Sequence, residues 1–353
     1  MYFYKNNKLI QSLNESKIKF YLKNFIEDVT EIQYELIKKG YENISIKVIL
    51  NNNKYLLRLC TIDKKHPMFS CIDKLVTREI NFMFFLKERG IAIPSIYSTL
   101  QENKYYFVSD IGQECIYAIL FKFVDGEHLT YNEATIEKTA KLQVKMHSIS
   151  QNYKFQKLLL DKNEQLYSAM AYRMQHHSKL YTETFPKNLY DTMLAIYKVI
   201  YNEIMPYYKF VAKQIIHSDL KMDNILFFNE EIAAIIDFSD MRYGTIAEDL
   251  GIYIWDMCDV LYDINLDFIP YVNYYLKVYS KYNNNFRIND QIMAINYAID
   301  RYLIINLYYL VENQVYEDKI KYQTNKAEKQ LKIIKSLLIY KNKLRKRGEL
   351  LDE

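Results

Sequence analysis

The chain has 353 residues, half of them apolar and a quarter charged, which is typical of a soluble globular protein with two lobes. No apolar run approaches the roughly 18 residues that span a bilayer, and the N-terminus lacks the apolar stretch of a signal peptide, so we expect a cytoplasmic protein without a membrane span. The formal net charge is +4, but residues 317–353 alone carry a net +5, so the other residues sum to −1, which argues against nucleic-acid binding. The tail is predicted to form an amphipathic helix with a solvated basic face, and a role at a membrane surface or with an anionic partner stays open.

The cysteines and histidines do not form a metal-site pattern. The four cysteines contain no CxxC pair, and their spacing suits neither zinc nor a dense disulfide framework, so we expect neutral, mostly buried thiols. His176 and His177 are adjacent, so on a helix their side chains point in different directions. A zinc site is therefore not predicted.

Two helices are predicted in the first third of the chain. Residues 14–39 have a helical pattern, with Asn14 as the N-cap and Gly40 as the stop. Residues 70–89 form the second predicted helix, which ends at Gly90.

The same third also holds strand patterns. Ile44–Leu50 and Lys54–Cys60 alternate between apolar and polar residues and are joined by three asparagines, which predicts a β-hairpin. Further strands are predicted at Ile96–Leu100, Lys104–Ser109 and Cys115–Val124.

After Asp125-Gly126-Glu127 the pattern becomes mostly helical. Short strand-like runs at Asn224–Phe228 and Ile232–Asp237 are the exception. The predicted helices are 132–148, 158–175, 187–205, 246–262, 266–282, 290–315 and 318–346. The fold class is therefore α+β, with a small β-rich first part and a larger, mainly helical remainder.

The segment with the clearest chemistry reads HSDLKMDNIL over residues 217–226 and IIDF over residues 235–238. Phosphoryl transfer needs a carboxylate that orients a hydroxyl and accepts its proton, and oxygen ligands for the Mg²⁺ that bridges the nucleotide phosphates. Asp219 is the candidate base, and Asn224 and Asp237 are the candidate metal ligands. We expect His217 to orient the loop.

These motifs resemble the H-G-D-x-x-x-x-N loop and the I-D-F or I-D-W motif of the aminoglycoside phosphotransferase-like superfamily of small-molecule kinases. That superfamily includes homoserine, hydroxylysine and choline kinases and has a two-lobed protein-kinase-like fold. The resemblance covers about residues 15–315. It implies an N-terminal nucleotide-binding lobe over residues 1–122 and a helical catalytic and acceptor-binding lobe over residues 123–353.

Other positions match the family in order. Residues 40–43 (GYEN) resemble the opening of its phosphate-covering hairpin, and Arg58 stands where the nucleotide-binding lysine occurs. Glu79 resembles the helix carboxylate that pairs with that cation. Lys122 and Val124 lie in a stretch that resembles the hinge, where main-chain groups bind the purine.

The sequence also departs from the family pattern. Ser218 replaces the usual glycine of H-G-D, and Arg58 replaces lysine, although a guanidinium also binds phosphate. Lys221 replaces a common histidine, and we expect it to contact the γ-phosphate. Asp249 matches the family's G-x-x-x-x-D-L, and we expect it to brace the catalytic loop by hydrogen bonds.

The resemblance implies Mg²⁺ with ATP or GTP as the phosphate donor, and a small hydroxyl compound as the acceptor. Asp249 follows Asp237 by only twelve positions, too few for the peptide-binding segment of a protein kinase. The preferred acceptor is an amino alcohol or a hydroxylated amino acid. An aminoglycoside phosphotransferase and a non-catalytic nucleotide-binding module stay open, as does the oligomeric state.

Acceptor recognition is less clearly marked. Asp256 and Asp259 follow Trp255 and are candidates for binding an ammonium group. Asp300, Arg301 and Asn306 interrupt an apolar helix, so they either pair internally or line the acceptor pocket.

Overall fold

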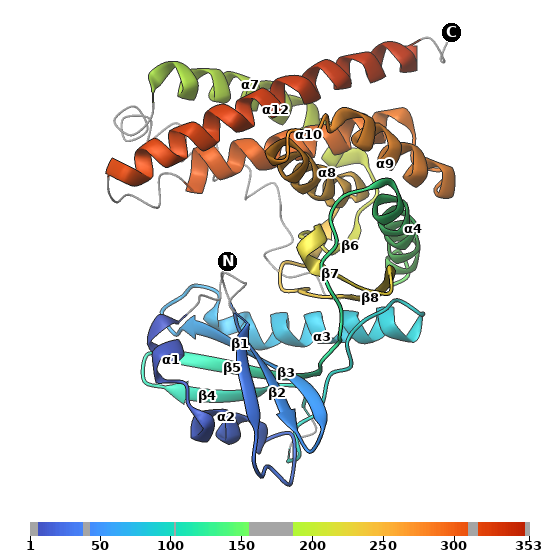
Figure 1. Cartoon of the computed structure of the whole chain (residues 1–353). Helices are drawn as coiled ribbons and strands as arrows, with labels where there is room; N and C mark the ends of the chain where they lie inside the picture. Colours follow the sequence, from blue (N-terminus) through green and yellow to red (C-terminus); the bar gives the residue numbers. More distant parts are fainter. Residues whose placement is uncertain (1–5, 38–42, 102–103, 155–185, 310–316, 350–353) are drawn as a thin grey trace. The chain divides into compact units, whose positions relative to one another are not determined.

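The computed structural model describes residues 6–37, 43–101, 104–154, 186–309 and 317–349 (Figure 1). The chain divides into two compact units. The first unit holds Met1–Glu127 and Leu226–Ser239, and the second holds His128–Ile225 and Asp240–Glu353. The sequence predicts a division of the chain at one point, between residues 122 and 123. In the structure, the first unit reaches Glu127 and also includes the later segment Leu226–Ser239. The assignment of nucleotide and acceptor binding to the two ranges stays a prediction.

The first unit contains a five-stranded antiparallel sheet with the order β1-β2-β3-β5-β4. Its strands are β1 (Gln33–Ile37), β2 (Asn43–Leu50), β3 (Asn53–Asp63), β4 (Phe107–Ile111) and β5 (Glu114–Lys122). The predicted asparagine hairpin is confirmed: Asn51 and Asn52 connect β2 to β3 with φ of 51° and 62°. Asparagine tolerates this left-handed backbone, which suits the twist of a tight hairpin.

Helices cover both faces of this sheet. The short helices α1 (Asn7–Ser12) and α2 (Glu15–Leu22) pack on one face in a common apolar core with β2, β3 and β5. On the opposite face, α3 (Ile72–Glu88) follows the 3-10 turn η1 (Phe69–Cys71) and ends before Gly90, which has φ of 75°. The predicted second helix and its glycine stop are therefore confirmed.

Two predictions in this unit are wrong. The helix expected over residues 14–39 stops at Leu22, although Asn14 caps it by accepting from the main-chain NH of Lys17 at 3.0 Å. Residues 33–37 instead form the edge strand β1, because their main chain pairs with β2. The strand expected at Ile96–Leu100 is reduced to one bridge between Ile96 and Phe121.

The hairpin of β7 (Ile225–Phe228) and β8 (Glu231–Ile235) packs within the first unit from Leu226 onward. The NH of Ile235 donates to the carbonyl of Ala92 at 2.8 Å. The ring of Phe238 lies 6.1 Å from that of Phe82 on α3. These contacts fix Asp237 beside the sheet and α3.

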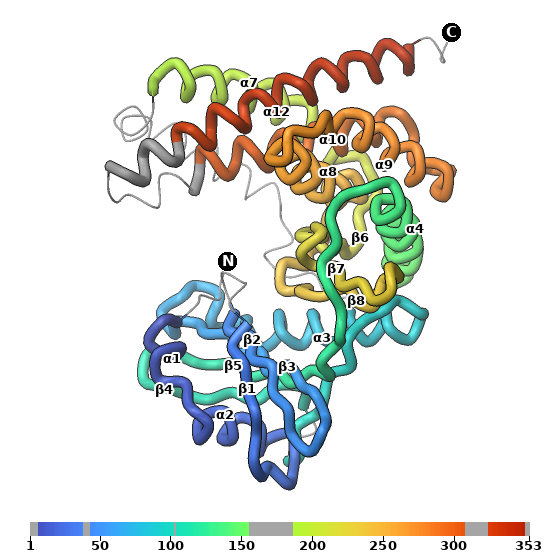
Figure 2. Tube along the Cα trace, in the orientation of Figure 1, coloured from blue at the N-terminus to red at the C-terminus, as the bar shows by residue number. Residues whose placement is uncertain are grey.

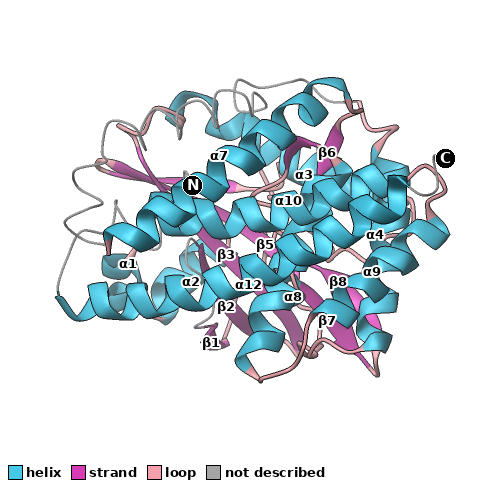
Figure 3. Ribbon diagram, turned by 90° about the horizontal axis from the view of Figure 1, so that it is seen from above, coloured by secondary structure: helices cyan, strands magenta, loops and turns pink. Residues whose placement is uncertain are grey.

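The second unit is mainly helical (Figure 3). Its helices are α4 (Glu133–Ser150), α7 (Lys187–Phe210), α8 (Ile246–Asp263), α9 (Ile269–Tyr282), α10 (Ile288–Ile304) with the π-helical turn η4 (Ile305–Tyr309), and α12 (Glu317–Glu349). The strands β6 (Gln214–Ile216) and β9 (Arg242–Gly244) pair, and the short turn η3 (Met222–Asn224) contacts α8. The helix predicted at 158–175 lies outside the described residues.

The basic helix α12 runs beside α10 (Figure 2) and carries a buried lysine. Lys341 is only 2% exposed, and its Nζ donates to Asn296 at 3.0 Å and to Glu203 at 3.1 Å. Burial lowers the pKa of Lys341, and Glu203 opposes that effect. The basic face is thus partly a structural contact, because this lysine ties α12 to α7 and α10. None of the described helices is long and apolar enough to cross a membrane.

The four cysteines are free thiols, and Cys60, Cys115 and Cys258 are buried. Burial raises the pKa of the Cys115 and Cys258 thiols. These two thiols are therefore neutral at physiological pH.

Candidate active site

In the first unit, Arg58, Glu79 and Asp237 form a charged cluster. Arg58 comes from β3 and Glu79 from α3, and Arg58 Nη2 lies 2.6 Å from Glu79 Oε1. Both side chains are buried, while Arg58 Nη1 lies 3.9 Å from Asp237 Oδ1. The ion pair expected from the resemblance is therefore formed, next to a candidate metal ligand.

The electrostatics keep Arg58 charged. Burial alone would lower the pKa of its guanidinium, but Glu79 and Asp237 outweigh burial and raise the pKa above its usual value. An isolated buried cation is costly, so this pair stabilises the first unit only while both partners are present.

Asp237 has a special backbone conformation. Its φ is 62°, which is uncommon for a residue other than glycine. Its side chain is 43% exposed, and its Oδ1 accepts a hydrogen bond from Ser239 Oγ at 2.8 Å. Such strained positions cluster at ligand-binding sites. The exposed carboxylate is available to bind a cation.

Lys122 is the last residue of β5, and Val124 follows two positions later. The NH of Lys122 donates to Ser95 at 2.8 Å and that of Phe123 to Lys54 at 3.1 Å. Among the described residues, the main-chain NH and carbonyl of Val124 form no main-chain hydrogen bond. Gly126 then approaches Phe227 so closely that a Cβ would lie 3.0 Å from its carbonyl oxygen. The Val124 main chain is thus available to the edge of a nucleotide base.

The second unit contains the catalytic-loop motif. Asp219 Oδ2 lies 2.8 Å from Lys221 Nζ and accepts from Asn224 Nδ2 at 3.0 Å. Asn224 Nδ2 also donates to the Asp219 carbonyl at 2.7 Å, so Oδ1 of Asn224 is the atom left for a cation. Asp219 Oδ1 is buried without a hydrogen bond. One carboxylate oxygen is therefore held in place, and the other is left without a hydrogen-bond partner.

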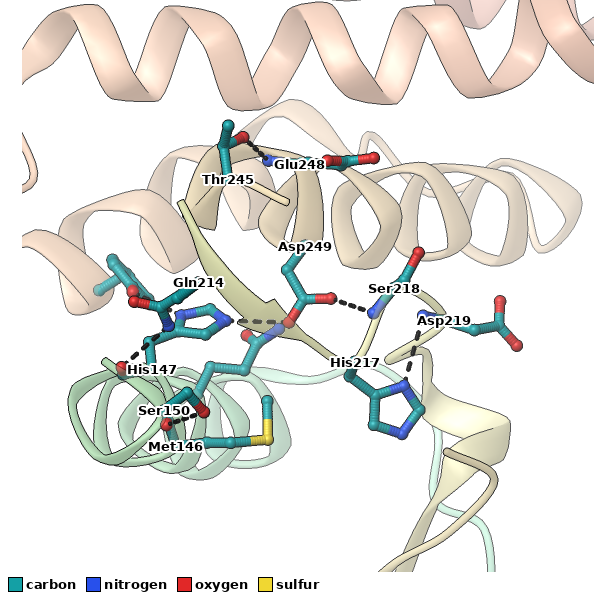
Figure 4. Close-up of polar contacts among 12 residues, drawn as sticks. Met146, His147, Ser150, Gln214, His217, Ser218, Asp219, Thr245, Glu248 and Asp249 are labelled. Atoms are coloured by element: carbon teal, nitrogen blue, oxygen red, sulfur yellow. Dashed lines mark hydrogen bonds and ion pairs between the residues drawn. The ribbon is translucent and has the colours of Figure 1, made fainter. Parts of the chain in front are cut away.

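A buried network around Asp249 braces this loop (Figure 4). Asp249 Oδ1 accepts from the NH of Ser218 at 2.7 Å, and its Oδ2 lies 2.9 Å from His147 Nε2. The NH of Asp219 donates to His217 Nδ1 at 3.3 Å. The bracing role predicted for Asp249 is confirmed by these contacts, and His217 contacts the loop as expected.

The charges of the loop follow from its contacts. Burial would raise the pKa of Asp249, but the hydrogen bonds from His147 and Ser218 lower the pKa below its usual value. Burial would lower the pKa of Lys221, but Asp219 raises it. Asp249 is therefore anionic and Lys221 cationic at physiological pH.

Ser218 has φ of 66°, a left-handed conformation that glycine adopts without strain. This explains why the family pattern has glycine here. The Ser218 hydroxyl is buried without a hydrogen-bond partner, so it does not compensate for the strain.

Sequence reasoning missed the contacts that α8 and α10 make with the loop. Asp256 Oδ2 accepts from the NH of Met222 at 3.2 Å and from the hydroxyl of Tyr131. Arg301 Nη2 lies 4.0 Å from Asp219 Oδ1. The interruption of an apolar helix by Arg301 was the sequence signal, but it did not show which residue Arg301 approaches. Asn306 pairs internally with Gln330.

The comparisons with known proteins agree with these observations. A family model described as the phosphotransferase enzyme family matches residues 33–266. The chain therefore belongs to this family and is a kinase. No curated protein matches the sequence significantly.

Solved structures show the same two-lobed kinase-like fold over nearly the whole chain. A microcompartment-associated aminopropanol kinase has 15% identity and a TM-score of 0.68, covering 93% of this chain and 98% of that one. An amicoumacin kinase in complex with AMP-PNP and Ca²⁺ has 13% identity and a TM-score of 0.67, covering 94% and 96%. Choline kinase from Cryptosporidium parvum Iowa II has 16% identity and a TM-score of 0.58, covering 95% and 97%.

Proposed function

We propose that this protein transfers the γ-phosphoryl group of ATP to a hydroxyl of an amino alcohol or a hydroxylated amino acid, with Asp219 as the catalytic base. GTP is the alternative donor, and a cytosolic location stays a prediction. The observation that carries the proposal is the asymmetry of Asp219. Its Oδ2 is held by Lys221 and Asn224, while its Oδ1 is buried without a hydrogen bond.

In this proposal, Asp219 Oδ1 receives the proton of the acceptor hydroxyl. The acceptor oxygen forms the new bond to the γ-phosphorus, and the bond between that phosphorus and the leaving oxygen of ADP breaks. Lys221 and Asn224 keep the carboxylate in one orientation, which supports positioning of the hydroxyl for in-line attack. We expect Lys221 to stabilise the negative charge of the transferred group.

The donor side of the proposal rests on the first unit. Arg58, held by Glu79, is a fixed cation of the kind that binds nucleotide phosphates. The free main-chain groups of Val124 support binding of the base, next to Lys122 at the end of β5. Residues 40–42 of the predicted phosphate-covering segment lie outside the described residues.

Asn224 in the second unit and Asp237 in the first each offer an oxygen of the kind that Mg²⁺ prefers, and Mg²⁺ takes few such ligands from the protein. The carboxylate of Asp237 is exposed, and the amide nitrogen of Asn224 is used on Asp219, which leaves its oxygen for the cation. When bound, Mg²⁺ would neutralise phosphate charge.

The acceptor class rests on the short link after Asp237 and on the resemblance to a superfamily that includes homoserine, hydroxylysine and choline kinases. The similar structures include aminopropanol and choline kinases, but at such low identity they support the fold only. An aminoglycoside acceptor is the alternative.

The experiment that tests the function is a transfer assay with labelled ATP and Mg²⁺. Homoserine, hydroxylysine, choline, ethanolamine, several aminoglycosides and a generic protein are offered separately. We expect phosphorylation of one of the first four. Preferential labelling of an aminoglycoside or of the protein would contradict the acceptor class, and nucleotide binding without any transfer would contradict the proposed function.

A further inference from the structure

Arg301 is a charged residue beside the proposed base that the mechanism above does not use. It lies in α10, within the second unit, and its side chain is 29% exposed. Its Nη2 lies 4.0 Å from Asp219 Oδ1, and its Nε is buried without a hydrogen-bond partner. Among the described residues, this long contact is its one ion pair. The charge of this partly buried guanidinium is balanced by one carboxylate at a long distance, which favours the binding of an additional anion.

Asp219 does not need Arg301 as its counter-ion. Lys221 already lies 2.8 Å from Oδ2 of this carboxylate, whereas Arg301 is on the side of Oδ1, the oxygen proposed to meet the acceptor hydroxyl. Any acceptor bound through Oδ1 therefore brings its neighbouring groups close to the guanidinium.

The guanidinium is also held in one orientation. Its Cζ lies 5.4 Å from the centre of the Trp255 ring, a cation–π contact that restrains the side chain. A restrained guanidinium presents its Nε and Nη donors as a fork that matches the two oxygens of a carboxylate.

The residues that sequence analysis assigned to an ammonium group are engaged elsewhere. Trp255 contacts Arg301, Asp259 lies 3.3 Å from Lys329, and Oδ2 of Asp256 accepts from Met222 and Tyr131. Recognition of an ammonium group by these three side chains is therefore less favoured than recognition of an anion by Arg301.

We infer that Arg301 binds a carboxylate of the acceptor, so that the acceptor is a hydroxylated amino acid or another hydroxy acid and not an amino alcohol without a carboxylate. This inference rests on the proposed function and narrows its acceptor class. A guanidinium also binds phosphate oxygens, so the test must separate acceptor recognition from contact with the donor nucleotide.

The test compares matched acceptors that differ by one carboxylate: homoserine with 3-amino-1-propanol, threonine with 1-amino-2-propanol, and serine with ethanolamine. Transfer of labelled phosphate from ATP gives kcat/KM for each, and KM for ATP is measured in parallel. Wild-type protein is compared with Arg301→Gln, Arg301→Lys and the control Arg345→Gln, which removes a more exposed arginine of the same unit.

In the acceptor pair that the wild type phosphorylates, we expect kcat/KM to be about tenfold or more higher for the member with the carboxylate. This is the usual effect of a charged hydrogen bond. Arg301→Gln should abolish that preference, Arg301→Lys should keep part of it, and KM for ATP should stay within about threefold, well below the effect of such a bond. Arg345→Gln should behave as the wild type.

Three results would overturn the inference. Phosphorylation of the amines in preference to the acids would show that the acceptor carboxylate is not recognised, while the proposed function would stand. An equal loss on acids and amines with a raised KM for ATP would place Arg301 on the nucleotide phosphates. Absence of transfer to every alcohol, with binding of nucleotide retained, would remove the proposed function and the inference with it.

Discussion

The main-chain NH of Ser218 donates to the buried carboxylate of Asp249 at 2.7 Å, and so joins the residue before the proposed base to α8. His147 holds the second oxygen of the same carboxylate at 2.9 Å. The position of Asp219 thus depends on a side chain thirty residues further along the chain, on another element.

Replacing Ser218 by glycine should stabilise the protein. The residue has φ of 66° and a buried hydroxyl without a hydrogen bond, so Ser218→Gly removes strain and an unsatisfied group. We expect the free energy of unfolding to rise by about 1 kcal/mol, as is usual for relief of a left-handed residue, with kcat retained. Urea unfolding measures this, and Ser150→Gly, within α4, is a control that should destabilise. A destabilised Ser218→Gly would show that the hydroxyl has a role that its contacts do not reveal.

Replacing Asp249 by asparagine should destabilise the protein in a pH-dependent way. Because the folded-state pKa of Asp249 lies below its unfolded value of 3.8, its contribution is present above about pH 4 and is lost as the pH falls through the folded value. Asp249 and His147 form a buried pair, and removing one partner of such a pair lowers the free energy of unfolding by about 3 kcal/mol. Denaturant unfolding of both proteins from pH 7 to pH 3 should show a difference that shrinks with acid. A constant difference would mean that the charge of Asp249 is not what stabilises the fold.

The roles of Arg58 in folding and in nucleotide binding can be separated. Arg58→Met leaves Glu79 buried without its 2.6 Å partner and should lower the free energy of unfolding by about 3 kcal/mol. The double variant with Glu79→Gln should recover part of this stability but still bind ATP weakly, because the cation is missing. ATP titration of the double variant checks the nucleotide role. Affinity equal to that of the wild type would leave Arg58 with a structural role only.

Asp237→Asn should raise the Mg²⁺ concentration needed for turnover and weaken ATP binding measured in Mg²⁺. Asparagine tolerates the positive φ of this position, so the change removes charge without new backbone strain. A magnesium titration of the transfer rate measures the effect. Asp110→Asn, which removes an exposed carboxylate of the same unit, is the control. An unchanged magnesium requirement would make Asp237 purely structural.

Parts of the fold whose signals are local in the sequence were predictable. The asparagine turn between β2 and β3 and the glycine that ends α3 follow from their immediate neighbours, whereas the roles of the loop residues Asp219, Lys221 and Asn224 stay predictions. Strand β1 was not predictable, because its residues do not alternate between buried and exposed positions. It is a strand because its main chain pairs with that of β2. The approach of Arg301 to Asp219 and the burial of Lys341 depend on helix packing between distant segments, which periodicity does not report.

The most direct test of the account is the transfer rate of Asp219→Asn. The amide keeps the size of the side chain but cannot accept the hydroxyl proton, and Asp223→Asn, in an exposed position of the same loop, is the matched control. We expect Asp219→Asn to bind ATP within a few-fold of the wild type and to lose roughly 10²–10⁴ in turnover, the usual contribution of a general base. Turnover of Asp219→Asn within tenfold of the wild type would contradict the assignment of Asp219 as the base.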